Sequence, residues 1–298
     1  MGYIILDLEF NNMRNITKYY ENIYENNPYL KDVKLENEII EIGAVKLDKF
    51  MKNIGEYKAY IKPTIFKVMN PKVEEITGIT EEMLEDGLSF KEAMEGVKAF
   101  VGEGDIICSW AKDDIAEIIE NANLHEYTDI NWLKDYLDIQ EYCTKILAHK
   151  KSLSLKNALE ELKIRVDEDK LHDALNDAVY TAEVFKRLYN SRIVKNYIVK
   201  DIYNMPAIMV KDLENYEIDD EKLDFKCPKC KTKFNVEQPL KLFNWRFMAI
   251  GKCPKCKAKI LHELIIKKTI SGDVVYNNLK TILSDIEYVD YSYKLEKQ

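Results

Sequence analysis

Residues 3–10 read Tyr3-Ile4-Ile5-Leu6-Asp7-Leu8-Glu9-Phe10, an apolar run interrupted by two carboxylates. The run predicts a buried β-strand. Because side chains alternate along a strand, Asp7 and Glu9 point to the same face. Two like charges buried side by side are very costly unless a cation neutralises them. The stretch therefore favours a divalent-metal site, and the alternative is an edge strand whose two acids face water.

The composition indicates a globular protein with two differently charged parts. The chain has 298 residues, 46% hydrophobic and 32% charged, with a net charge of −8. Between Lys222 and Lys268, thirteen Lys and Arg stand against three acids, a formal +10, so the acidic excess lies in the first 221 residues. This asymmetry predicts an acidic body joined to a basic module.

Targeting signals are not apparent in the sequence. No apolar run is long enough to span a bilayer, and the first apolar stretch carries Asp7 and Glu9, which argues against a signal peptide. We therefore expect a protein of the reducing cytoplasm.

The order of the predicted elements indicates an α/β fold. Strands are expected at 38–47 and 57–61, forming an antiparallel meander with the first strand, and residues 11–37 form an insertion with at most one short helix near Tyr19–Tyr24. Strands followed by alternating helices and strands predict a mixed sheet with helices packed against it. The remaining expected strands are 105–110 and 130–133, and the expected helices are 89–101, 113–121, 154–163, 171–190 and, near the C-terminus, 277–286.

A second acidic motif, after Asp7-x-Glu9, follows the strand that ends at Trp110. Asp113 and Asp114 come where an α/β sheet delivers residues to a site. We favour Asp114, which opens the next helix. The alternative is a solvated helix N-terminus, where acids suit the helix dipole.

A third motif is the segment Leu171-His172-Asp173-Ala174-Leu175-Asn176-Asp177-Ala178. Five residues separate His172 from Asp177, so within one helix they do not share a stripe. They converge only if the helix begins after His172. The alternative is a capping or surface histidine.

Together these three motifs resemble those of the DEDDh branch of the DnaQ-like 3′-to-5′ exonucleases, which have an RNase H-like fold. The resemblance rests on Asp7-x-Glu9, on Asp114 after Ser109-Trp110, and on His172-x-Ala174-Leu175-x-Asp177-Ala178, and it covers residues 3–189. Ser154-Leu155 is similar to the segment that leads into the family's His motif. Thr77-Gly78-Ile79-Thr80 is similar to the family's Thr-Gly-Ile motif, whose apolar residue wedges near the terminal base.

The resemblance implies which residues contact metal and substrate. Asp7, Glu9, Asp114 and Asp177 would hold two Mg²⁺ or Mn²⁺, and His172 would be the base for the attacking water. Substrate contacts are implied for Phe10, Thr77, Gly78, Ile79 and Trp110. The sequence departs from the family at Phe10, a place often held by Thr, and in the longer insertion at 11–37. Both departures bear on the substrate.

The chemistry of phosphodiester hydrolysis agrees with this reading. Two divalent ions stabilise the attacking and leaving oxygens, and hard cations prefer carboxylate ligands. Four carboxylates balance two such ions in charge. Imidazole titrates near neutral pH, so His172 suits the role of base. The resemblance further implies release of 5′-mononucleotides from a free 3′ end.

The basic module carries two Cys-x-x-Cys pairs, Cys227/Cys230 and Cys253/Cys256. Their spacing is typical of a structural four-thiolate zinc ribbon without an open ligand position. Two disulfides are the alternative, which a reducing compartment disfavours. The expected division is therefore an exonuclease domain at 1–190, a connector at 191–222, a zinc ribbon at 223–268 and a C-terminal tail at 269–298.

The function of the ribbon has two interpretations. Lysines interleaved with aromatic residues suit single-stranded nucleic acid, and the alternative is that the aromatics form the ribbon's core or that the ribbon docks on protein. The functions considered are an exonuclease, a non-catalytic nucleic-acid-binding protein, and a proofreading-type module that docks on a polymerase. RNA and DNA are not distinguished. The lysines and aromatic residues of the ribbon on which these interpretations depend are Lys226, Lys229, Lys231, Lys233, Lys252, Lys255, Lys257, Lys259, Phe234, Phe243, Trp245 and Phe247.

Overall fold

The computed structural model describes residues 2–33, 35–167, 171–210, 213–269 and 271–297. The outermost ends of the predicted exonuclease domain and tail, residues 1 and 298, lie outside this part. The chain divides into two compact units, Met1–Ile202 and Tyr203–Gln298, so the division falls inside the predicted connector. Each unit has its own sheet and its own hydrophobic clusters, and each is described by itself.

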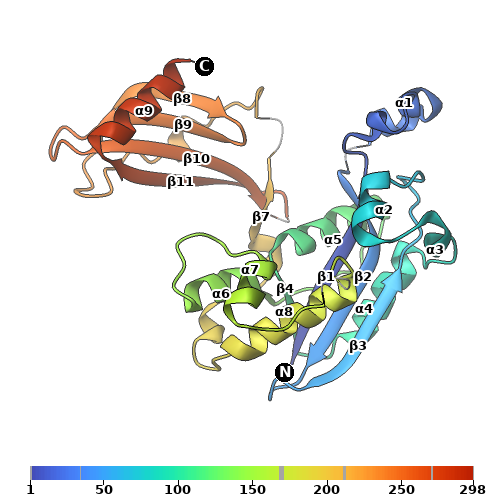
Figure 1. The fold of residues 1–298 in the computed structure, drawn as a ribbon. Helices are drawn as coiled ribbons and strands as arrows, with labels where there is room; N and C mark the ends of the chain where they lie inside the picture. Colours follow the sequence, from blue (N-terminus) through green and yellow to red (C-terminus); the bar gives the residue numbers. More distant parts are fainter. Residues whose placement is uncertain (1, 34, 168–170, 211–212, 270, 298) are drawn as a thin grey trace. The chain divides into compact units, whose positions relative to one another are not determined.

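The first unit is built on a six-stranded mixed sheet in the order β3-β2-β1-β4-β5-β6 (Figure 1). Strands β1 to β3 form the expected antiparallel meander, and β4 and β5 then run parallel to β1. The mixed α/β sheet predicted from the sequence is confirmed. The strands are β1 (Tyr3–Asn12), β2 (Asn37–Leu47), β3 (Asn53–Tyr60), β4 (Ile106–Ser109), β5 (Tyr136–Asp138) and β6 (Ile198–Val199).

Helices cover this sheet, and their ends carry the caps that the sequence provides. Ser89 begins α4 with a capping box, and Asp173 caps α8 by accepting from the backbone of Asn176. Figure 1 shows α8 lying along β1 and β2, where Ala178, Ala182 and Phe185 join the main core. The helices are α1 (Ile23–Asn26), α2 (Pro71–Thr77), α3 (Glu81–Glu85), α4 (Phe90–Phe100), α5 (Asp113–Leu124), α6 (Ile139–Ile146), α7 (Leu155–Glu161) and α8 (Ala174–Leu188).

The insertion between β1 and β2 forms a small lobe. Short 3-10 turns flank its one short α-helix, α1, at Ile16–Lys18 and Pro28–Lys31. Its apolar side chains, with Ile16, Ile23 and Leu30 at the centre, pack against Phe66. The lobe therefore has a core of its own in addition to its polar, Asn-rich surface.

The strand expected at 130–133 is wrong. Residues 130–133 make a turn, in which Leu133 N–H donates to the Ile130 carbonyl at 3.0 Å, and the strand β5 follows three residues later. Ile130 and Leu133 are both buried, so the apolar signal reports burial of a turn. Four residues, three of them apolar, are too few to distinguish the two structures by periodicity.

The second unit has a sheet in the order β11-β10-β9-β8, with β7 paired to the far end of β10 (Figure 1). Helix α9 packs on it through Tyr288 and Leu295, which contact Met248, Ile250 and Leu261. Part of the predicted connector, strand β7, therefore belongs to the same sheet as the basic module. The elements are β7 (Pro206–Met209), β8 (Asn235–Phe243), β9 (Arg246–Lys252), β10 (Lys259–Thr269), β11 (Val274–Leu283) and α9 (Asp285–Glu296).

The helix expected at 277–286 is also wrong. Residues 274–283 form β11, which pairs with β10 over its whole length after a turn at Gly272 (φ 94°). The helix begins only at Asp285, after a capping box at Ser284. Pairing with a long neighbouring strand overrides the weak helical preference of this segment. Among the described residues no helix is both long and apolar enough to cross a membrane.

Candidate functional site

Strand β1 presents Asp7 and Glu9 on one face, as the alternation of the strand predicts. Both residues are half-buried within an otherwise buried strand. Burial raises the pKa of Asp7 well above its usual range, and the nearby carboxylates of Asp114 and Asp177 raise it further. Burial and the Asp177 charge raise the pKa of Glu9 to about 8. The edge-strand alternative does not fit, because β1 lies between β2 and β4.

Helix α5 brings Asp114 to these carboxylates. Strand β4 runs parallel to β1, so the helix that follows it begins beside the carboxylate face. Burial raises the pKa of Asp114 to about 8, and Asp113 and Glu117 add to the effect. Asp113 is exposed. The structure therefore directs Asp114 toward Asp7 and its neighbour toward solvent.

The start of α8 brings His172 and Asp177 together. The helix begins at Ala174, and His172 precedes it in a left-handed conformation (φ 63°). The backbone N–H of His172 donates to Asp177 Oδ2 at 3.3 Å. Ligand atoms of Glu9, His172 and Asp177 lie within 4.8 Å of one another. Convergence of the two residues thus depends, as the spacing required, on a helix that starts after the histidine.

Asp177 has an unused oxygen in this cluster. Its Oδ1 is buried and has no hydrogen-bond partner in the described part of the chain. Burial raises its pKa, and the charges of Asp173 and Glu41 act in the same direction. A buried carboxylate oxygen without a donor costs free energy unless another ligand satisfies it.

A further buried acid, Glu41, was not singled out by the sequence patterns. It lies on β2 directly opposite Glu9 and is 0% exposed. Burial raises its pKa, against the ion pair with Lys58 and the hydrogen bond from the Ala174 backbone, which lower it. The only sequence signal was an acid inside the apolar run Ile39–Val45, which a strand prediction absorbs without assigning it a role.

The predicted substrate residues occupy different environments. Phe10 is half-buried at a β-bulge that follows Glu9, and Gly78 ends α2 with a positive φ of 70° and open space beside it. Thr77 is half-buried and accepts through Oγ1 from Ile79 N–H. Ile79 is only 2% exposed and packs against Ile40 and Leu84, and Trp110 is half-buried with its ring in two core clusters. Their role as substrate contacts stays a prediction.

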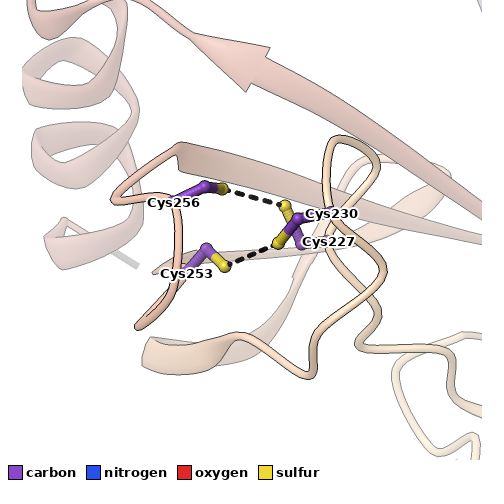
Figure 2. A group of neighbouring side chains, drawn as sticks. All are labelled: Cys227, Cys230, Cys253 and Cys256. Atoms are coloured by element: carbon purple, nitrogen blue, oxygen red, sulfur yellow. Dashed lines mark hydrogen bonds between the residues drawn. The ribbon is translucent and has the colours of Figure 1, made fainter.

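The four cysteines of the second unit converge (Figure 2). Their sulfur atoms all lie within 4.8 Å of one another. The Cys227–Cys256 and Cys230–Cys253 Sγ–Sγ distances are 3.6 and 3.4 Å, far longer than the ~2.05 Å of a disulfide. The set of four soft ligands is the one that zinc prefers.

Each Cys-x-x-Cys pair is folded by the same local hydrogen bonds. Lys231 N–H donates to the Cys227 carbonyl at 2.9 Å, and Lys257 N–H donates to the Cys253 carbonyl at 3.0 Å. Both lysines adopt a positive φ, 62° and 59°. The two pairs are therefore local copies of one turn, and only their approach to each other depends on the sheet.

The predicted lysines and aromatic residues of this unit differ in exposure to solvent. Phe234 and Phe247 are buried, as the core interpretation expected. Trp245 is 49% exposed at the tip of the β8–β9 hairpin, and the Arg246 guanidinium lies 4.7 Å from its ring centre. Seven of the eight predicted lysines are exposed, and Lys259 is half-buried.

Comparison with known proteins finds a family and a fold. The family model described as Exonuclease (RNase_T) matches residues 4–185. A DNA polymerase III PolC-type protein of Thermotoga maritima is 34% identical over 151 residues, covering 51% of this chain and 10% of the relative. A DNA polymerase III subunit epsilon of Buchnera aphidicola is 26% identical over 190 residues, covering 62% of this chain and 72% of the relative.

Among solved structures, the nuclease domain of 3′hExo, a DEDDh family member bound to rAMP, has the same fold. The TM-score is 0.55 at 18% identity, covering 67% of this chain and 96% of that one. This chain spans about a tenth of the length of the PolC-type relative. The similarity lies in the part that carries the carboxylate cluster.

Proposed function

We propose that this chain, which belongs to the RNase_T exonuclease family, is a metal-dependent 3′-to-5′ exonuclease acting on single-stranded nucleic acid. The observation that carries the proposal is the convergence of acidic residues from β1, α5 and α8 with His172 beside Glu9 and Asp177. These residues all lie within the stretch that the family model matches.

Divalent cations fit the carboxylate cluster. The raised pKa values of Asp7, Glu9, Asp114 and Asp177 reflect like charges crowded together under burial, and Asp177 Oδ1 has no donor among the described residues. These four residues would hold two Mg²⁺ or Mn²⁺, which prefer oxygen ligands. When bound, the ions would stabilise charge on the attacking and leaving oxygens.

His172 is our proposed general base. Its side chain is exposed, so a water molecule can reach it, while its backbone is fixed by the bond to Asp177. Within reach of the attacking water, the imidazole would accept its proton. The products would be 5′-mononucleotides released from the 3′ end.

The second unit would hold one structural zinc through Cys227, Cys230, Cys253 and Cys256. Four thiolates leave no open position for catalysis. The site needs reduced cysteines, which is consistent with a reducing compartment such as the cytoplasm.

The same unit would contact the substrate through Trp245. An exposed indole with a stacked guanidinium suits an unpaired base, and the exposed lysines suit phosphates. A second candidate function, a proofreading-type module that docks on a polymerase through the ribbon, is favoured by the 34% identity to a PolC-type polymerase. A polymerase that co-purifies with the full chain, and is lost with Trp245→Ala, would support it.

The test is cleavage of 5′-labelled single-stranded RNA and DNA of matched sequence with Mg²⁺ or Mn²⁺. We expect a ladder that shortens from the 3′ end, and the preferred sugar will identify the substrate class. Asp114→Asn should abolish the ladder. Asp113→Asn is the matched control, because this neighbouring acid is exposed, and it should retain activity. Failure of the wild-type chain to cleave either strand would leave a non-catalytic nucleic-acid-binding protein as the alternative.

A further inference from the structure

The buried acid Glu41 has two partners from different elements. Lys58 on β3 places its Nζ 2.7 Å from Glu41 Oε1, and the backbone N–H of Ala174 donates to Oε2 at 3.0 Å. Glu41 is therefore an acceptor for the first residue of α8. Oε1 is engaged by the ion pair with Lys58, and Oε2 accepts the hydrogen bond from Ala174, whereas Asp177 Oδ1 has neither among the described residues.

Lys58 continues the connection from Glu41 to the start of the helix. Its Nζ also makes an ion pair and hydrogen bond with Asp173 Oδ2. The other oxygen of Asp173 accepts from Asn176 N–H at 3.0 Å and so caps α8. A chain of three charges, Glu41–Lys58–Asp173, thus ties the sheet to the cap of the helix.

Gly43 allows the helix to come this close. It is two residues from Glu41, on the same face of β2, and pairs with Asp7 on one side and Lys58 on the other. A Cβ at this position would lie 2.1 Å from the Ala174 carbonyl carbon and from the Leu175 nitrogen. The first turn of α8 is therefore in direct backbone contact with β2.

The residues fixed in this way lie between His172, which precedes α8, and Asp177 in its first turn. Asp173 and Ala174 follow His172 directly and precede Asp177 by four and three residues, respectively. From this geometry we infer that Glu41 and Lys58 are positioning residues, which hold the start of α8 so that His172 and Asp177 meet Glu9 of β1. The inference rests on the proposed exonuclease function.

Packing alone does not explain the buried Glu41, whose partner Lys58 reaches the surface. Burying a glutamate is costly even when it is paired, and an apolar pair of similar volume often serves stability equally well. The charged pair adds direction, because Glu41 can accept only from donors correctly placed on Lys58 and α8. Misplacement of a reacting group by about 1 Å can cost a hundredfold in rate.

The test compares two ion pairs of the same sheet. Lys58→Met removes the link to α8, and Lys46→Met is the matched control, since Lys46 also lies in the sheet and pairs with Asp105 at 2.8 Å. We expect Lys58→Met to lower kcat about 10- to 100-fold with KM for the oligonucleotide unchanged. Lys58→Arg should recover most of the rate. Lys46→Met should leave kcat within about twofold of wild type.

Asp173→Asn provides a second variant if Lys58→Met does not fold. Asparagine still caps the helix but loses the ion pair with Lys58. We expect a similar loss of kcat at unchanged KM. A lower melting temperature with unchanged kcat in both variants would overturn the inference and leave the network a purely structural role.

An activity-independent measurement separates this inference from the proposed function. The chain has four histidines, so the imidazole NMR signals can be assigned by comparison with His172→Ala. Lys58→Met should shift the His172 signal, and Lys46→Met should not. An unmoved His172 signal would count against positioning even in an active enzyme, whereas an inactive wild type would count against the exonuclease.

Discussion

The two ligand clusters of this protein are assembled in opposite ways. The four cysteines come from two local turns, each closed by its own backbone hydrogen bonds between residues four apart. The carboxylates come from β1, α5 and α8, which span residues 7 to 177, and converge only when the sheet and its helices are in place. One cluster is thus a property of short segments, and the other is a property of the whole first unit.

The difference extends to the electrostatics of the two clusters. Protonation of Asp7, Glu9, Asp114 and Asp177 is favoured, because burial and the charges of neighbouring carboxylates raise all four pKa values. In the second unit, backbone and side-chain hydrogen bonds from Thr232 lower the pKa of Cys230 to about 6. Local hydrogen bonds thus prepare Cys230 as a thiolate. At Cys256, a hydrogen bond from the Ala258 backbone is outweighed by burial and by hydrogen bonds with the other three thiols, which raise the pKa to about 11. The thiol pKa values therefore shift in both directions, whereas all four carboxyl pKa values rise.

The largest expected effect breaks the cysteine cluster alone. Cys227→Ser should abolish zinc binding and destabilise the second unit, because metal binding to four thiolates is coupled to folding. Zinc content by mass spectrometry should fall from one per chain to none. Cys143→Ser, outside the cluster, is the control and should keep its zinc. Retention of full zinc by Cys227→Ser would contradict the proposed site.

The next effect separates chemistry from metal binding in the carboxylate cluster. His172→Ala should lower single-turnover cleavage about 10²- to 10⁴-fold, since it removes the proposed base. Mn²⁺ affinity, measured by calorimetry, should stay near wild type because the four carboxylates remain. His149→Ala, an exposed histidine paired with Glu161, is the control. Near-wild-type cleavage by His172→Ala would exclude its role as base.

A smaller effect tests whether the second unit contacts the substrate. Trp245→Ala should weaken binding of single-stranded oligonucleotide by about 1–3 kcal/mol, the contribution of one stacked base. Fluorescence anisotropy in an Asp114→Asn background avoids cleavage during the measurement. Tyr293→Ala removes a comparably exposed aromatic residue of the same unit and should leave affinity unchanged. If Trp245→Ala binds the oligonucleotide as tightly as Tyr293→Ala and the unsubstituted background do, the result would favour a role of the second unit in docking on a protein.

A last expected effect is the pH dependence of stability without divalent metal. Glu9 and Asp114 have folded-state pKa values of about 8, above the ~4 of an unfolded acid. The folded chain therefore binds more protons than the unfolded chain between these values, so stability falls as pH rises from about 4 to about 8. Calorimetry should show a falling transition temperature for the first unit in magnesium-free buffer. Glu9→Gln should flatten the decline, and Mg²⁺ should offset it at high pH.

Much of the first unit could be predicted from its sequence. The apolar run at 3–10 and the caps at Ser89 and Ser154 mark real elements, because their signals are local. The errors at 130–133 and 277–286 arose where a neighbouring segment decides the structure. A buried turn has the hydrophobicity of a strand, and β11 depends on ten residues of pairing with β10.

The sequence by itself determined the types of metal ligand and the order of the motifs along the chain. The chemistry of a carboxylate, an imidazole or a pair of thiolates belongs to the residue type, so it can be identified without the fold. Only the tertiary structure decided that Asp114 and not Asp113 approaches Asp7, that α8 starts after His172, and that Glu41 faces Glu9. The reason is physical. Burial, like-charge repulsion and the close approach of α8 to Gly43 arise between segments far apart in the chain, and no local pattern records them.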